Sequence, residues 1–152
     1  MNTSTTSLLL VCSAMLLPIH LAFASAPAGR YTIGGGTVYD TKTKLTWQQT
    51  VPSGTYTPAG AKAYCTSATV STTLGGSGWR LPTVKELLTL EDFSQASAPL
   101  IDPSAFPGTP AEIFWSSTPV AGMASNAWFV DFNEGGADFN GVPGTGGVRC
   151  VR

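Results

Sequence analysis

Alternating apolar and polar positions predict β-strands in the first and last thirds of the chain. Between Arg30 and Gln49, β-branched and aromatic residues alternate with polar ones, and turn signals interrupt them at 34–36 and at 41–43. This pattern is typical of half-buried strands in a hairpin. The same kind of pattern predicts four later strands, at 114–118, 127–132, 137–139 and 147–152.

Capping residues predict two helices in the middle of the chain. The pair Thr57-Pro58 fits an N-cap followed by a first helical position, and an alanine-rich segment follows it. Thr83 and Glu86 have the spacing of a capping box, which predicts a second helix from Thr83 through Leu90. The segment 67–78 between the two helices is interpreted as a loop.

The segment 91–113 shows little periodicity and contains four prolines. A connection of this length without regular structure is uncommon, so we expect it either to carry function or to be tied to the core. Its large apolar residues are the expected anchors: Phe93, Leu100, Ile101 and Phe106. The order of strands, two helices, a long loop and an antiparallel sheet predicts an α+β fold, because the chain lacks the alternation of a βαβ protein.

The N-terminal residues have the form of a signal peptide. They carry no Asp, Glu, Lys or Arg, the stretch Leu8–Leu17 is nearly all apolar, and Ala22–Ala24 has the small-x-small form that signal peptidase accepts. Residues 1–24 are therefore predicted to be removed. This leaves a lead-in at 25–36 and one domain at 37–152.

The apolar stretch is too short for an uncleaved membrane anchor. Pro18 and His20 interrupt it, and a spanning helix needs about 20 apolar residues. No later segment reaches that length. The mature chain is therefore predicted to be secreted or periplasmic and to have no membrane span.

Composition excludes several classes of function. Charged residues make up 11% of the chain, against a typical ~25%, so no basic field is available for nucleic acid. The only histidine, His20, lies in the predicted signal peptide, and its loss removes the commonest general base and transition-metal ligand. Nothing fixes a separation between two of the loop carboxylates that could hydrolyse a glycoside: Glu91, Asp92, Asp102 and Glu112. The chain is therefore predicted not to be an enzyme and to need no cofactor, with calcium as the one candidate ion.

Two cysteines would remain in the mature chain, because Cys12 lies in the predicted signal peptide. Cys65 and Cys150 could form a reactive pair or a structural disulfide. Exported proteins sit in oxidising surroundings, and the two cysteines form no CxxC motif, so the structural disulfide is favoured.

Aromatic and basic residues supply the first binding candidates. An exposed tryptophan could stack on a sugar ring, although core packing is the favoured role for Trp47, Trp79, Trp115 and Trp128. Arg80 could grip a carboxylate or a sulfate, although pairing with an internal carboxylate is favoured. Trp79 and Arg80 are retained as ligand-binding candidates.

A polar segment near the end of the chain supplies the other candidates. Its oxygen-bearing side chains could surround a calcium ion, which prefers six to eight oxygen ligands: Asp131, Asn133, Glu134, Asp138 and Asn140. The spacing matches no EF-hand loop, and a polar hairpin turn is the favoured interpretation, so no metal is assigned. The first four of these residues are retained as ligand-binding candidates.

Six motifs in order resemble the Lcl C-terminal domain family, a bacterial exported domain. The motifs are Thr37–Trp47, Ala63–Cys65, Gly78–Leu87, Phe114–Thr118, Ala127–Phe132 and Val148–Arg152. The resemblance implies a C-type-lectin-like fold, with two helices flanking antiparallel sheets and a long irregular loop region on one side. It also implies that Cys65 and Cys150 are the family's recurring pair.

Loops of such folds often bind sugar or protein. The chain has no Glu-Pro-Asn, Gln-Pro-Asp or Trp-Asn-Asp motif, so calcium-dependent sugar binding is not implied. The predicted function is an exported, non-catalytic binding module that recognises a surface carbohydrate or protein through segments 91–113 and 133–144. Two alternatives stay open. One is a structural surface or assembly protein without a small-molecule site, and the other is a cysteine oxidase like the distantly related formylglycine-generating enzymes.

Overall fold

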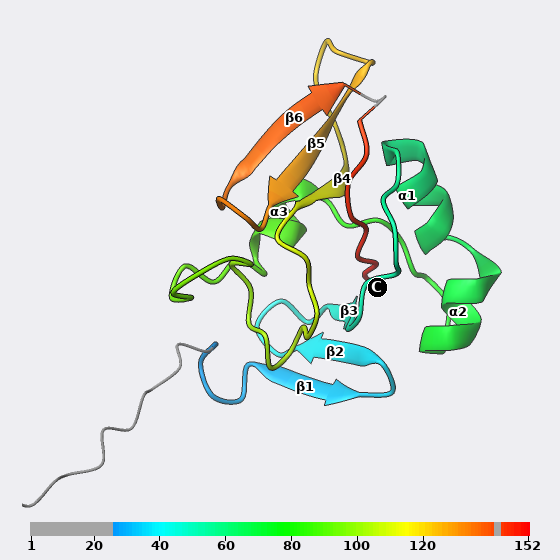
Figure 1. The fold of residues 1–152 in the computed structure, drawn as a ribbon. Helices are drawn as coiled ribbons and strands as arrows, with labels where there is room; N and C mark the ends of the chain where they lie inside the picture. The colour runs from blue at the N-terminus through cyan, green and yellow to red at the C-terminus, as the bar shows by residue number, and fades with distance from the viewer. Residues whose placement is uncertain (1–25, 142–143) are drawn as a thin grey trace, which may run out of the picture.

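The computed structural model describes residues 26–141 and 144–152 (Figure 1), so the predicted signal peptide at 1–24 lies outside the described residues. The described part of the chain is a mixed α+β fold with three helices and two antiparallel sheets of three strands each. The predicted fold class is confirmed, and the structure adds one helix that the sequence pattern did not predict.

The N-terminal hairpin segment forms sheet A. Its strands follow one another in the order β1 (Tyr31–Gly34), β2 (Thr37–Asp40) and β3 (Thr46–Gln48). Val38 lies opposite Trp47 across β2 and β3, and both side chains are fully buried. Tyr39, the next residue in β2, is 38% exposed. Sheet A therefore shows the alternation that the sequence predicted, with one face on the core.

The last third of the chain forms sheet B, in the order β4 (Ile113–Pro119), β5 (Asn126–Asp131) and β6 (Ala137–Gly141). Phe114 lies opposite Val130, and Trp115 lies opposite Phe129. Because neighbouring residues of a strand point to opposite faces, sheet B contributes to an apolar cluster on each side. Helix α1 (Pro58–Cys65) packs against β4, and α3 (Val84–Leu88) packs against β4 and β5.

The three helices begin at capping side chains. Thr57 accepts a hydrogen bond from the Gly60 N–H, and Thr83 forms a capping box with Glu86, as predicted. The expectation of a loop at 67–78 is wrong, because Ala68–Leu74 forms helix α2. The Ser67 hydroxyl accepts from the Val70 N–H at 3.3 Å and provides the N-cap of this helix.

The C-terminal segment connects the two sheets. The predicted strand at 147–152 is wrong, because this segment makes isolated bridges to several partners instead of one continuous ladder. Gly147 pairs with Phe114 of β4, while Val151 pairs with both Trp47 of β3 and Arg80. In Figure 1 this segment, in red, runs from the side of β4 down to β3. It therefore ties sheet A to sheet B.

Two apolar clusters make up the core. The first joins sheet A, α3 and the face of β4 and β5 that carries Phe114, and the second joins α1, α2 and the face that carries Trp115. Ile101 and Phe106 anchor the segment 91–113 in the first cluster, as predicted. Phe93 is 69% exposed, so its predicted role as a buried anchor is wrong. None of the helices in residues 26–141 and 144–152 has the length and apolar character needed to cross a membrane.

Candidate functional site

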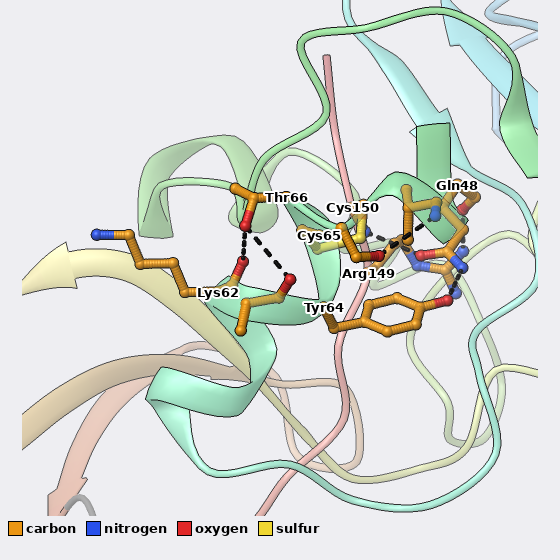
Figure 2. The surroundings of a disulfide bond; sticks show 10 residues. Gln48, Lys62, Tyr64, Cys65, Thr66, Arg149 and Cys150 are labelled. Atoms are coloured by element: carbon orange, nitrogen blue, oxygen red, sulfur yellow. Dashed lines mark hydrogen bonds between the residues drawn. A yellow bond between two sulfur atoms is a disulfide. The ribbon is translucent and has the colours of Figure 1, made fainter. Parts of the chain in front are cut away.

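The disulfide joins the end of α1 to the C-terminal segment (Figure 2). The sulfur atoms of Cys65 and Cys150 are bonded, the two Cα atoms are 5.3 Å apart, and both residues are fully buried. The predicted pairing is therefore present in the structure. A buried disulfide is typical of proteins from oxidising compartments and offers no thiol for chemistry.

Gln48 forms a second, noncovalent connection beside the disulfide (Figure 2). Its side-chain nitrogen donates to the Tyr64 hydroxyl at 3.0 Å, and its side-chain oxygen accepts from the Cys150 N–H at 3.2 Å. Its backbone N–H donates to the Cys150 carbonyl at 2.9 Å. Gln48 thus holds β3, α1 and the C-terminal segment together.

Arg149 is a fully buried cation in the same region. Its guanidinium donates to the Gln48 carbonyl at 2.7 Å and to the Thr109 hydroxyl at 2.7 Å, and it lies 4.7 Å from the centre of the Phe106 ring. Burial lowers the pKa of Arg149 to about 9. These neutral acceptors and the aromatic ring stabilise a charge that is costly to bury. We assign this residue a structural role.

Two of the ligand-binding candidates lie away from the others. Trp79 is 4% exposed, its indole N–H donates to the Gly75 carbonyl, and the Arg152 guanidinium covers its ring at 5.0 Å. Arg80 pairs with both carboxylate oxygens of Glu86, at 2.6 and 2.8 Å, which is the internal pairing that was favoured. In this arrangement the Trp79 indole and the Arg80 guanidinium are both engaged by partners within the chain.

The other candidates gather at the hairpin between β5 and β6. A hollow of about 300 Å³ lies on sheet B beside this turn. It is lined by three of the predicted ligand residues and by an aromatic side chain, and the lining residues with side chains beyond Ala are Phe129, Asp131, Glu134 and Asp138. No Lys or Arg is among the described residues that line it.

Strand register explains this gathering. Phe129 and Asp138 are cross-strand partners in β5 and β6, so their side chains share one face of sheet B. The Phe129 ring meets the buried Trp115 ring edge to face at 5.9 Å, which fixes its position. Asp131 ends β5, and its carboxylate accepts from the Asn133 N–H at 2.8 Å. Asn133 orders the turn but does not line the hollow.

The segment 91–113 reaches the back of the same turn. The Glu91 carboxylate accepts a hydrogen bond from the Gly136 N–H, and the Leu100 N–H donates to the Phe132 carbonyl at 2.7 Å. Burial raises the pKa of Glu91, and the nearby charge of Asp131 raises it further. The two segments expected to carry recognition therefore lie side by side.

Gly135 also packs closely against the segment 91–113. Its φ is +83°, and a Cβ atom there would lie 2.5 Å from the Phe93 ring. Only glycine fits this position without displacing Phe93. The sequence did not indicate Phe129 or Glu91 for this site, because no short motif around either residue predicts that it lies beside the turn.

The calcium alternative gains no support from the geometry. Asp131, Asp138 and Asn140 each use a side-chain oxygen to accept a backbone N–H of the same hairpin. Within residues 26–141 and 144–152, no group of three or more His, Cys, Asp or Glu side chains is placed to hold a metal ion. We therefore assign the cluster to the turn and its hollow.

These observations define a disulfide-bonded α+β domain with an acidic hollow beside a β-hairpin. Residues 36–152 match the model of the Lcl C-terminal domain, and the chain belongs to this family. The match begins one residue before the predicted domain start at Thr37 and extends to the last residue. A comparison with curated proteins finds no match.

Proposed function

We propose that this chain is an exported, non-catalytic module that binds a carbohydrate or protein of the cell surface through the hollow beside the β5–β6 turn. The observation that carries the proposal is the convergence of Asp131, Glu134 and Asp138 around Phe129. Binding sites commonly combine an apolar surface with a few polar groups that fix orientation.

The chemistry of the hollow favours carbohydrate as the first ligand class to test. Carboxylates accept hydrogen bonds from hydroxyl groups, and bonds to an ionised acceptor are stronger than neutral ones. The Phe129 ring offers an apolar face for the C–H side of a sugar. A protein ligand is the alternative, and the exposed Phe93 beside the same turn would then extend the contact surface.

Export is supported by the disulfide and by the predicted signal peptide at 1–24, which would leave a mature chain from residue 25. The absence of catalysis is supported by the chemistry of the mature sequence, which has no histidine after His20. A cysteine oxidase would need a free thiol, while Cys65 and Cys150 are bonded and fully buried. A structural assembly role remains the second alternative.

A glycan array with residues 25–152 tests the proposal, followed by calorimetric titration of the strongest hit. We expect Asp131→Asn with Glu134→Gln to weaken binding at least about tenfold, or about 1.4 kcal/mol, because charge-assisted hydrogen bonds are lost. Glu112→Gln is the matched control, since Glu112 lines a different hollow with Val51 to Thr55. Equal affinity of all three proteins would overturn the proposed site.

An empty array combined with capture of a surface protein would identify the protein alternative. In that case the same two variants distinguish the site, because loss of capture by the Asp131 and Glu134 changes would still locate binding at the hollow. If neither ligand class bound, the binding function itself would be refuted in favour of an assembly role.

A further inference from the structure

Strand β6 is the edge of sheet B. It pairs with β5 on one side only (Figure 1), and four of its five residues are exposed. The unpaired N–H and C=O groups of an edge strand are a template for a strand of another molecule. An exposed edge beside Phe139, which is 38% exposed, is therefore a place where two copies of this chain could join.

The hydrogen bonds around β5 determine which backbone groups of β6 point outward. The Asp131 N–H donates to the Gly136 carbonyl at 3.0 Å, toward the β6 side of the hairpin. In an antiparallel pair, hydrogen-bonded residue pairs alternate with pairs that are not hydrogen-bonded. Asp131 and Gly136 form a hydrogen-bonded pair, so the register places Phe139 and Gly141 in pairs that are not hydrogen-bonded. Their backbone groups therefore face away from β5.

Both outward N–H groups and the Gly141 carbonyl already have partners within the chain. The Asp138 carboxylate accepts from the Phe139 N–H at 2.8 Å, and the Asn140 side-chain oxygen accepts from the Gly141 N–H at 2.8 Å. The Gly141 carbonyl accepts from the Gly144 N–H at 2.9 Å. An incoming strand would have to displace these bonds before it could form its own.

We propose that Asp138 and Asn140 keep the β6 edge from adding a strand of a second copy of this chain. Each side chain accepts a hydrogen bond from the outward N–H of the residue that follows it. The Phe139 and Gly141 N–H groups are therefore not available to an incoming strand. This assigns both residues a role that is separate from ligand binding. Asp138 also lines the hollow.

Sedimentation velocity of the disulfide-bonded chain 25–152 over a range of concentrations tests the proposal. We expect Asp138→Ala with Asn140→Ala to self-associate at least tenfold more tightly than the wild type. The matched control is Asp131→Ala with Asn133→Ala, which removes the same two residue types from the same hairpin but not from the edge. A folded edge variant that sediments as the wild type does would overturn the proposal.

A second variant separates the caps from charge and from loss of stability. Asp138→Asn with Asn140→Asp keeps an acceptor at both positions and the same net charge, so it should sediment like the wild type. Amide exchange of the wild type provides a test that needs no variant. We expect the Phe139 and Gly141 amides to exchange at least tenfold more slowly than in an unstructured peptide, and exchange at the unstructured rate would refute the caps.

Discussion

At the scale of single residues, the Glu86 carboxylate accepts hydrogen bonds from two different residues. It accepts from the N-cap Thr83 N–H at 2.8 Å and pairs with Arg80 through both carboxylate oxygens. The hydrogen bonds from Arg80, together with those from Thr83, lower the pKa of Glu86 from 4.5 to about 2. The folded chain therefore binds fewer protons than the unfolded chain between these pH values. The stability that Glu86 contributes is fully present above about pH 4.5 and is lost as the pH falls toward 2.

Glu86→Gln should lower the free energy of unfolding at pH 7 by about 1 kcal/mol, because it weakens both the capping box and the ion pair. The Arg80 side chain is 43% exposed, so solvent screening keeps the loss modest. Urea titrations should show the deficit at pH 7 and a smaller one at pH 2.5. Burial raises the pKa of Glu112, so the control Glu112→Gln should not destabilise at pH 7. A Glu86 deficit that is the same at both pH values would contradict this linkage.

The residue scale also shows what local sequence can predict. Thr83 and Glu86 are three positions apart, so their capping box depends on one turn of helix and could be predicted. Phe129 reaches the hollow through strand pairing. Glu91 contacts the Gly136 N–H of the turn, although the two residues are 45 positions apart in the sequence. No short pattern encodes contacts of that kind.

At the scale of elements, α2 shows how composition can conceal a helix. Its sequence contains Thr, Val and Ser, which have low helix propensity, so no strong local signal marks the helix. The structure stabilises the helix in other ways. Ser67 caps its first turn, Val70 is buried in the second apolar cluster, and Gly75 follows its last residue with a φ of +71°. Tertiary packing outweighs the weak local preference.

Ser67→Ala should therefore lower the free energy of unfolding by about 1 kcal/mol, since an N-cap side chain is lost. Thr72→Ala is the control in the same helix, because Thr72 is exposed and its hydroxyl only bonds back to the Ala68 carbonyl. We expect that control to be neutral or slightly stabilising. Urea denaturation of both variants measures the difference. Equal midpoints would contradict the stabilisation of α2 by the Ser67 side chain.

The C-terminal segment explains the other error at this scale. Its apolar and β-branched residues predicted a strand, and its backbone is indeed paired, but with partners on several elements. The Val151 backbone exchanges two hydrogen bonds with Arg80. The backbone of the next residue, Arg152, exchanges two hydrogen bonds with Thr46. A sequence pattern predicts extended conformation, whereas the number of partners depends on the whole fold.

At the scale of the whole molecule, the disulfide closes a long loop. Cys65 and Cys150 are separated by 85 positions, and a crosslink across such a distance restricts the unfolded chain strongly. The pairing could be predicted because only two cysteines follow the predicted signal peptide. The Gln48 connection beside it could not, because it depends on three elements meeting at one side chain.

Cys65→Ala with Cys150→Ala should lower the free energy of unfolding by about 2–5 kcal/mol. Reduction of the wild type should produce a loss of the same size, which separates the crosslink from the packing of the sulfur atoms. Adding Gln48→Leu to the cysteine variant should destabilise it further, because Tyr64 and Cys150 then lose their shared partner. Denaturation by urea under matched redox conditions measures all three. An unchanged stability after reduction would contradict the role of the disulfide.

At the same scale, the hollow beside the β5–β6 turn is the proposed binding site of this domain. The most direct measurement is an amide chemical-shift titration of ¹⁵N-labelled chain 25–152 with the ligand that the array or capture experiment yields. The account predicts the largest shifts at Phe129, at Glu134 and at the two glycines that line the hollow, Gly135 and Gly136. Largest shifts around Trp79 and Arg80, or in the hollow lined by 51–55, would contradict it.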